Sequence, residues 1–381
     1  MPDDNPADDK TEISSQSGMT GPDNPETDKD ESEPEEDDTI SLIMVGDILL
    51  HIPVDASAKR EDGTYDFNAI FSETKDDIEK ADLALVNQEV IIGGEELGVS
   101  GYPAFNAPYE IADALVDNGF DVILHATNHA LDKGKKGIQN CTANWEEKYP
   151  DIAYIGIAAN EEKADEIYIY EDKGIKIAIL NYTYGTNGIP LPSDMPYAVN
   201  LLKESRVKED IQRAEELADF TIVCPHWGIE YSLETSAEQE KWAKLFLENG
   251  VDLVIGTHPH VIEPIEIYER ENGEKMLVYY SLGNYVNWTS GTGAKVSKRM
   301  LGGMAKVTVG RDEDGKVVIE DYGVEALVCD LHKGEDGVKV YPLSEYSEEM
   351  AAENAIVRQA DGFSYEYLVS LCNDIWGEMW E

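Results

Sequence analysis

Short apolar runs that end directly in polar clusters recur along this chain of 381 residues, and they limit its fold more than any other feature. Each run has the length and composition of a strand that is buried on both faces. The segments between several of these runs have the apolar spacing of amphipathic helices. Strands that alternate with helices predict an α/β fold with a largely parallel sheet. The runs begin near Ile40, Asp82, Asp121, Asp219 and Asp252.

One of the predicted helices is marked at both ends. Ser236 and Gln239 have the spacing of a capping box, and Gly250 fits the residue that follows a helix. The pattern changes from about residue 260, where residues 276–281, 302–310 and 316–327 follow one another as predicted strands. These strands predict a second, more antiparallel sheet, and the last 40 or so residues have helical spacing.

The polar residues at the predicted strand ends are those that bind metals. In an open α/β sheet, ligands bind beyond the carboxyl ends of the strands. Five of the 7 histidines lie at or just after such ends, and Asp, Glu and Asn accompany them. Each cluster alone also fits a turn, a helix cap or a packed side chain, but together they indicate a transition-metal site. The candidate residues are Asp47, Glu89, Asn128, His129, His226, His258 and His260.

The charge of the chain restricts its partners and suggests its location. A net charge of -48 repels nucleic acid and anionic lipid headgroups. Residues 1–38 are strongly acidic with few large apolar side chains, so they are predicted to be a disordered leader. Neither an 18-residue apolar run nor a signal at residue 1 is present. We therefore expect an extracytoplasmic domain, tethered to the membrane or cell wall through an N-terminal segment absent from this chain.

The order of the clusters resembles a known family. Its motifs here are Gly46-Asp47, Asn87-x-Glu89, Asn128-His129-x-x-Asp132, His226-Trp227-Gly228-x-Glu230-Tyr231, His258-Pro259-His260 and Ser281-Leu282-Gly283-Asn284. The pattern over about residues 40–327 is similar to that of the poly-gamma-glutamate capsule synthesis (CapA) family, whose fold resembles the calcineurin-like metallophosphoesterases. The resemblance implies a four-layer α/β/β/α sandwich with mixed sheets. It divides the chain into the leader, a domain over 39–328 and a mostly helical extension over 329–381.

The resemblance also implies residue roles. Asp47 and His260 would bind a first metal ion, Glu89 would bridge two ions, and Asn128, His226 and His258 would bind the second. His129 would be the acid near the leaving group, with Asp132 fixing its tautomer. The site would bind one or two divalent transition-metal ions, which would be Mn, Fe or Zn. The residues expected to line the substrate pocket are His51, Asn87, Trp227, Glu230, Tyr231 and Asn284.

One departure from the phosphoesterase pattern concerns the first metal. Many such sites open with Asp-x-His, but Ile48 and Leu49 follow Asp47 here, and His51 is the nearest substitute.

Taken as a whole, the resemblance implies a metal-dependent hydrolase in capsule, poly-gamma-glutamate or other cell-surface polymer biosynthesis. The expected partners are an anionic surface polymer or phosphoester and a membrane-bound polymer synthase. The alternatives are a non-catalytic accessory that binds polymer or synthase, and a phosphoesterase for small phosphate esters.

Overall fold

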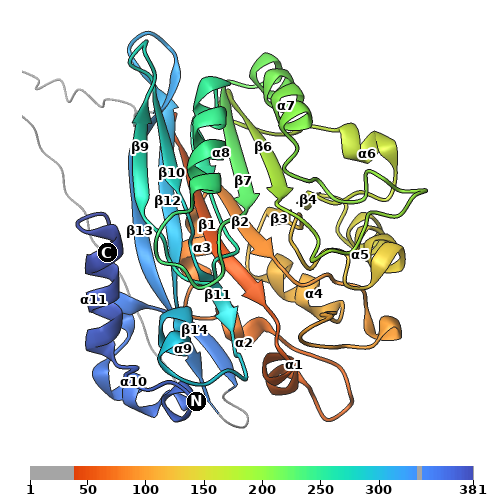
Figure 1. The fold of residues 1–381 in the computed structure, drawn as a ribbon, viewed down its shortest axis with the longest axis vertical. Helices are drawn as coiled ribbons and strands as arrows, with labels where there is room; N and C mark the ends of the chain where they lie inside the picture. Colours follow the sequence, from red (N-terminus) through yellow and green to blue (C-terminus); the bar gives the residue numbers. More distant parts are fainter. Residues whose placement is uncertain (1–37, 333–336, 381) are drawn as a thin grey trace, which may run out of the picture. The chain divides into compact units, whose positions relative to one another are not determined.

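The structure, a computed structural model, describes residues 38–332 and 337–380. The predicted leader therefore lies outside the described residues except for Asp38. The described part contains two mixed sheets, each with a run of parallel strands that is extended by antiparallel strands (Figure 1). No helix in this part is both long and apolar enough to cross a membrane.

The first sheet has eight strands in the order β14-β13-β12-β1-β2-β3-β4, with β11 paired to β1. Strands β1 to β4 run parallel to one another, whereas β12, β13 and β14 are antiparallel to their neighbours. Its strands are β1 (Ile40–Leu49), β2 (Leu83–Gln88), β3 (Val122–Leu124), β4 (Ala153–Ile155), β11 (Asn284–Asn287), β12 (Leu301–Arg311), β13 (Val317–Leu331) and β14 (Val338–Pro342). The predicted boundary between residues 328 and 329 falls within β13.

The second sheet has six strands in the order β5-β6-β7-β8-β10-β9. Strands β6, β7, β8 and β10 are parallel, and β5 and β9 close the two edges in the antiparallel sense. Its strands are β5 (Tyr168–Asp172), β6 (Ile175–Thr183), β7 (Phe220–His226), β8 (Leu253–Ile255), β9 (Ile265–Glu269) and β10 (Lys275–Tyr279).

The prediction of a separate antiparallel sheet after residue 260 is wrong. Strand β10 lies in the six-stranded sheet beside β8 and parallel to it. Strand β12 instead pairs with β1, and β13 pairs with β12, so both belong to the eight-stranded sheet. The apolar patterns of these segments identify strands, but they carry no information on which neighbour completes the backbone hydrogen bonds.

Helices cover the outer faces of the two sheets, as the four-layer prediction requires. Along β6, Ile177 and Ile179 pack into the core shared with the first sheet, and Ala178 and Leu180 pack against α7 and α8. This alternation places the six-stranded sheet between the other sheet and a helical layer. The thiol of Cys224 on β7 lies 3.8 Å from the sulfur of Met44 on β1, where the two sheets meet.

Helix α8 begins at the residue that the capping box predicts. The side chain of Ser236 accepts from the backbone of Gln239, and both halves of the capping box are formed at the start of α8. The α-helices are α1 (Ile52–Ala58), α2 (Asn68–Phe71), α3 (Lys75–Lys80), α4 (Glu110–Asp117), α5 (Gly134–Lys148), α6 (Glu161–Asp165), α7 (Glu204–Leu217), α8 (Ala237–Glu248), α9 (Ala294–Ser297), α10 (Glu348–Glu353) and α11 (Tyr365–Trp376). Short 3-10 turns are η1 (Glu95–Leu97), η2 (Lys298–Met300), η3 (Leu343–Glu345) and η4 (Ala355–Arg358). Figure 1 shows α10 and α11 alongside β13 and β14.

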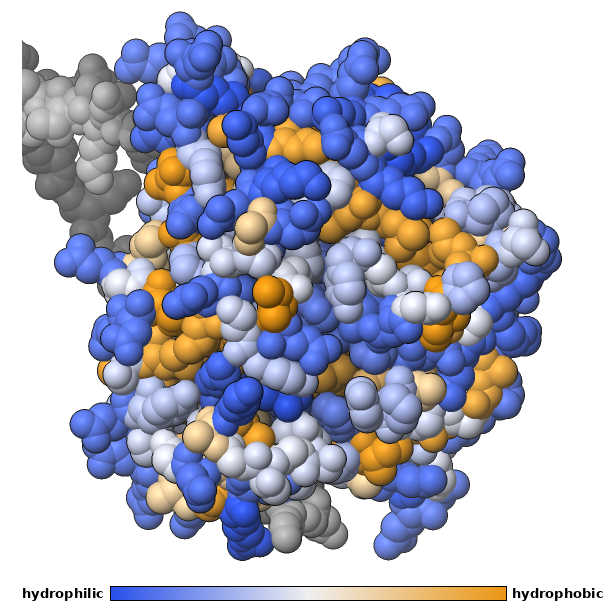
Figure 2. Space-filling model, viewed as in Figure 1, coloured by the Kyte–Doolittle hydropathy of each residue, from blue (hydrophilic) through white to orange (hydrophobic). Residues whose placement is uncertain are grey.

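The face of the molecule in Figure 2 is mainly hydrophilic, with apolar residues in scattered patches. This agrees with the strongly acidic composition. Most of the predicted functional side chains are buried in the interior.

Candidate metal centre

The predicted ligands come together where the strand ends of the two sheets meet. Asp47 lies on β1 and Glu89 directly follows β2, both in the eight-stranded sheet. His226 ends β7, and His258 and His260 follow β8, both in the six-stranded sheet. The strand pattern alone predicted one largely parallel sheet, which is wrong, because these residues come from two sheets. The centre forms between two sheets because the sheets pack with these strand ends side by side.

Asp47 is held in place by the backbone around it. The register of β1 shifts between Val45 and Asp47, and the amide of Asp47 donates to the carbonyl of Gly283 at 2.9 Å. Asn87 and Asn284 are its partners in the neighbouring strands β2 and β11. One carboxylate oxygen of Asp47 accepts from the Asn87 amide at 2.8 Å, and the other accepts from the backbone of His258 at 3.1 Å.

Two groups of side chains have donor atoms close enough to share an ion, and Glu89 belongs to both. The first group is Asp47, Glu89 and His260, and the second is Glu89, His226 and His258. Within each group the donor atoms lie within 4.8 Å of one another. The Glu89 carboxylate lies 3.6 Å from Nδ1 of His260 and 3.9 Å from Nε2 of His226. This division of the residues is the same as the one that the resemblance implies.

The state of Glu89 fits a bound divalent cation. Its side chain is fully buried, and neither carboxylate oxygen has a hydrogen-bond partner in the structure. Burial raises the pKa of Glu89 well above its ordinary range, and the nearby Asp47 carboxylate adds to this. A buried carboxylate without partners is destabilising unless a cation compensates it. Nδ1 of His258 is also buried without a partner, so both a carboxylate and an imidazole nitrogen are available as metal ligands.

Neighbouring polar groups orient the second group. Nε2 of His226 lies 3.0 Å from Oδ1 of Asn128, and its Nδ1 lies 3.0 Å from the hydroxyl of Thr257. His258 has a φ of 101°, which is unusual for a residue with a side chain. Backbone in this region is retained where the surroundings require it, often at functional sites. Here it lets the His258 amide reach Asp47 while its ring packs 4.8 Å from that of His226.

The charges around the histidines differ in a way that matters for metal uptake. Burial lowers the pKa of His226 and of His258, and the neighbouring imidazoles lower it further. Burial also acts to lower the pKa of His260, but Glu89 and Asp47 beside it outweigh this and raise that pKa to about 9. In the metal-free protein His226 and His258 are therefore neutral at neutral pH, and His260 carries a proton.

Metal affinity should depend on pH because of this proton. A protonated imidazole is not a ligand, so metal uptake near pH 7 must release the proton of His260. Burial also raises the pKa of Glu89, so any proton on that carboxyl must leave as well, and we expect the apparent affinity for Mn²⁺ to rise at least about tenfold per pH unit from pH 7 toward pH 9. Competition against a chelating dye at pH 6.5, 7.5 and 8.5 measures this affinity, and a flat profile would contradict the assignment.

The proton on His260 also stabilises the metal-free fold. This contribution is complete below about pH 6.5 and is lost as the pH rises through 9, so the melting temperature of the metal-free protein should fall over that range.

His129 lies at the edge of the centre with a fixed ring. Its Nδ1 lies 2.7 Å from Oδ2 of Asp132, and the backbone of Phe105 donates to the same carboxylate at 2.7 Å. Nε2 of His129 lies 4.0 Å from Glu89. With Asp132 at Nδ1, the nitrogen that faces the centre is Nε2.

Most of the residues predicted to line the pocket surround the centre. His51 has its Nε2 buried without a partner, and burial, with Arg299 nearby, lowers its pKa to about 3. Oδ1 of Asn284 lies 3.0 Å from Nδ1 of His260, and the ring of Tyr231 lies 6.0 Å from that of His260. Asn87 is buried against Asp47 as described above, and Glu230 is exposed beside Tyr231.

Trp227 lies away from the candidate ligands, and its role in substrate binding stays a prediction. The side chain is buried against α8, stacks on Tyr280 and donates to the Tyr280 carbonyl at 2.9 Å. Successive side chains of a strand point to opposite faces, so the residue after His226 turns away from the centre.

Arg299 in η2 also lies near the centre and was not among the predicted residues. Its side chain is only 8% exposed, and its charge acts on His51, Glu89 and His260. No strand end marks it, because it lies in an irregular segment between β11 and β12. The one available signal is the clustering of Lys295, Lys298 and Arg299 in an otherwise acidic chain.

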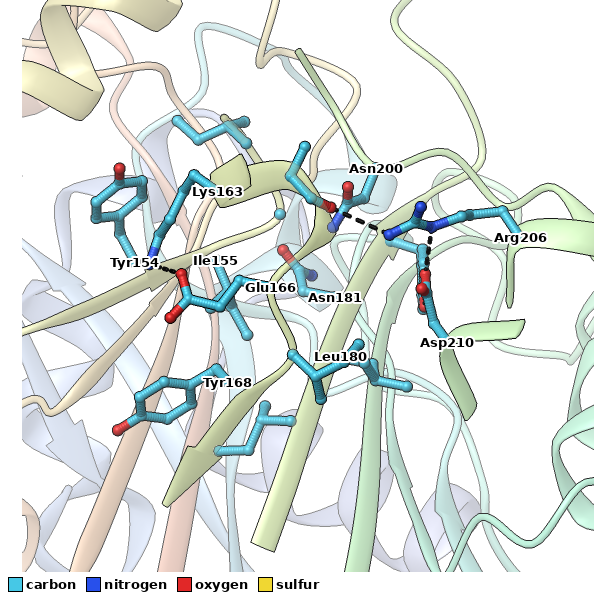
Figure 3. Close-up of a pocket in the computed structure, with 16 residues that line it drawn as sticks. Tyr154, Ile155, Lys163, Glu166, Tyr168, Leu180, Asn181, Asn200, Arg206 and Asp210 are labelled. Atoms are coloured by element: carbon cyan, nitrogen blue, oxygen red, sulfur yellow. Dashed lines mark hydrogen bonds and ion pairs between the residues drawn. The ribbon is translucent and has the colours of Figure 1, made fainter. Parts of the chain in front are cut away.

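A second hollow in the structure lacks this chemistry. Figure 3 shows it beside β6, lined by Asn181, Arg206 and Asp210 among others. Arg206 is already paired with Asp210 at 2.8 Å and donates to the carbonyl of Ala164 at 3.1 Å. The charge of Asp210 in this hollow is therefore paired within the chain, and neither metal-ligand group lies there.

Comparison with known proteins identifies the family. Residues 41–289 match the family described as bacterial capsule synthesis protein PGA_cap. The capsule biosynthesis protein CapA of Bacillus anthracis is 27% identical over 67% of this chain and 62% of its own length. The PGA biosynthesis protein CapA of Bacillus subtilis is 32% identical over 47% of this chain and 47% of its own length. This chain therefore spans less than two thirds of either relative.

Among solved structures, the NAD nucleotidase of Haemophilus influenzae is similar with a TM-score of 0.44 and 12% identity. That similarity covers 87% of this chain and 59% of the other. The family match alone covers well over half of the chain and includes Asp47, Glu89, Asn128, His226, His258 and His260. The chain belongs to the PGA_cap family of bacterial capsule synthesis proteins.

Proposed function

We propose that this protein is a metal-dependent hydrolase in the biosynthesis of a capsule, of poly-gamma-glutamate or of another cell-surface polymer. The observation that carries the proposal is Glu89, which is fully buried, has no hydrogen-bond partner on either carboxylate oxygen and lies within reach of both His226 and His260. A protein that only packed these residues would leave several buried polar groups unsatisfied. The family supports the polymer context.

The proposed ligands follow the two groups. Asp47, Glu89 and His260 would hold one divalent transition-metal ion, and Glu89, His226, His258 and Asn128 would hold the other. When bound, such ions lower the pKa of a water molecule and stabilise negative charge on a phosphoryl or carbonyl oxygen. Asn87, through its hydrogen bond to Asp47, keeps that carboxylate turned toward the centre.

His129 would donate a proton to the leaving group from Nε2, the nitrogen that does not face Asp132. We expect His129→Ala to lower the turnover of an activated ester about 10²- to 10⁴-fold with metal content unchanged. Asp132→Asn should lower it less and shift the pH profile, because the ring loses its fixed tautomer.

The matched control for this prediction is His332→Ala. His332 also pairs with an aspartate, Asp330, at 2.5 Å, but it lies on the surface and in neither ligand group. The control should retain full turnover. Wild-type turnover in His129→Ala would remove the residue from the mechanism.

The proposed substrate is an ester or amide of an anionic surface polymer, or a phosphoester. A membrane-bound polymer synthase is the proposed partner, and the proposed location is extracytoplasmic, with the domain tethered near that synthase. The net charge of -48 disfavours long-range attraction of such a polymer. Local cations, first of all the metal ions, would have to attract the substrate.

One observation favours a second candidate, a non-catalytic accessory that binds a polymer or the synthase. The first ligand group contains a single histidine, and Ile48 and Leu49 follow Asp47 where another ligand would be expected. A weakly held first ion would leave a binding site without hydrolytic activity. A phosphoesterase for small phosphate esters is the remaining alternative.

One experiment separates these functions. Chelator-free protein is loaded with Mn, Zn or Fe, and hydrolysis of p-nitrophenyl phosphomonoesters and phosphodiesters is followed beside His260→Ala. Metal-dependent turnover that the variant lacks supports the hydrolase. Bound metal with no turnover on these esters would leave the metal centre in place and exclude them as its substrate class. Absence of bound metal, with no hydrolysis of any ester, contradicts the hydrolase and supports the accessory.

A further inference from the structure

Arg299 is an unusual side chain for its position. It is 8% exposed, yet Nε is buried and has no hydrogen-bond partner. Its one side-chain hydrogen bond in the structure goes from an Nη atom to the hydroxyl of Thr289 at 3.3 Å. A guanidinium carries five N–H donors, and a buried donor without an acceptor is destabilising. The arginine therefore has capacity for an acceptor that the chain itself does not supply.

No carboxylate neutralises this guanidinium. Within the described residues, Arg299 has no carboxylate oxygen within 4.0 Å, although Asp and Glu number 78 in the chain. Arg270, which is half-buried, is by contrast paired with Asp252 at 3.7 Å. An arginine left unpaired in so acidic a protein points to a negative charge that arrives from outside.

The position of Arg299 directs it to the candidate metal centre. Its guanidinium lies 4.6 Å from the centre of the Tyr231 ring, and that ring lies 6.0 Å from the ring of His260. Its backbone carbonyl accepts from Asn284 at 2.9 Å, and the same Asn284 side chain lies 3.0 Å from Nδ1 of His260. Burial lowers the pKa of Arg299, while Tyr231, Glu230 and Glu89 oppose this, which places acidic groups of the site nearest to it.

We infer that Arg299 binds an anionic oxygen group of the substrate, a carboxylate or a phosphate, next to the bond that the metal centre acts on. The planar fork of a guanidinium matches two oxygens of such a group, and Tyr231 holds the fork by stacking on it. The substrate then carries a negative charge beside the reacting bond. This inference rests on the proposed function, because without metal ions Asp47 and Glu89 would repel the anion.

The test is oxyanion binding by the Mn²⁺-loaded protein, measured by titration calorimetry at fixed ionic strength. The probes are inorganic phosphate and glutarate, which separate a phosphate from a carboxylate as the preferred group. Arg299→Gln is expected to weaken binding of the preferred probe about 100-fold, and Arg299→Lys about tenfold, since lysine keeps the charge but loses the fork. Arg358→Gln, the same charge change on an exposed arginine, should bind as wild type does.

Metal content and melting temperature are measured first for each variant. Wild-type protein that takes up no metal defeats the proposed function and is recognised at this step. Metal-loaded wild type that binds neither probe, or variants that bind the probe as tightly as wild type, overturn the role of Arg299 and leave the metal centre intact. Should Arg299→Gln fail to fold, Arg299→Lys carries the same comparison, because it retains the cation over Tyr231.

Discussion

Glu89→Gln is expected to remove most of the bound metal and to lower any metal-dependent turnover at least about 10³-fold. Glu89 is the one residue common to both ligand groups, so a neutral amide in its place weakens both at once. Metal ions contribute several kcal/mol to such reactions, and each 1.36 kcal/mol corresponds to a factor of ten. Elemental analysis of chelator-free protein gives the metal content directly.

The same substitution should act in the opposite direction on the metal-free protein. Burial raises the pKa of Glu89, so its ionised form lowers the stability of the empty fold as the pH rises above about 4.5. Glutamine removes that charge, and metal-free Glu89→Gln should exceed metal-free wild type in stability by about 1–3 kcal/mol at pH 7. Thermal melts with and without EDTA measure both effects.

Glu263→Gln is the matched control. Glu263 is also fully buried with one carboxylate oxygen unpaired, and burial raises its pKa to about 8, but it belongs to neither ligand group. It should retain the metal of the wild type. Equal metal content in Glu89→Gln and Glu263→Gln would show that Glu89 is an ordinary buried carboxylate.

Gly46→Ala is expected to destabilise the metal-free protein by about 3 kcal/mol or more. A Cβ at this position would lie 2.0 Å from the carbonyl oxygen of Gly283, where β1 and the start of β11 approach each other. Backbone atoms on both sides cannot move aside as a flexible side chain would. The next residue is Asp47, whose amide donates to the same carbonyl, so the shift should also weaken metal binding.

Urea unfolding of EDTA-treated protein measures this effect without a contribution from metal. The control is Gly185→Ala, because a Cβ there meets no atom within 4 Å and its φ is not positive. The control should change the stability by no more than about 1 kcal/mol, and it can be stabilising. An unchanged urea midpoint for Gly46→Ala would mean that the approach of the two strands is looser than described.

Local features of the sequence identified residues that the structure brings together at the candidate centre. An apolar run identifies a buried strand, and the polar residues that follow it must lie at the strand end, so Asp47, Glu89 and His226 could be found without a structure. The capping box of α8 is equally local, since Ser236 and Gln239 satisfy each other. The two-sheet α/β fold came from the family resemblance.

Features that depend on distant pairing could not be found in this way. Strand β12 pairs with β1 although some 250 residues of chain separate them. Arg299 reaches the centre only because the segment between β11 and β12 folds over Tyr231. The orientation of Trp227 is a local feature, because the alternation of side chains along β7 turns that residue away from His226.

The most direct test of the metal centre is anomalous diffraction from a crystal of the chain grown with Mn²⁺. We predict anomalous peaks beside the Glu89 carboxylate, one toward Asp47 and His260 and one toward His226 and His258. A single peak at either position would still place an ion on Glu89 and would reduce the count to one. The absence of any peak at Glu89, with Mn²⁺ bound only elsewhere or not at all, would contradict the account.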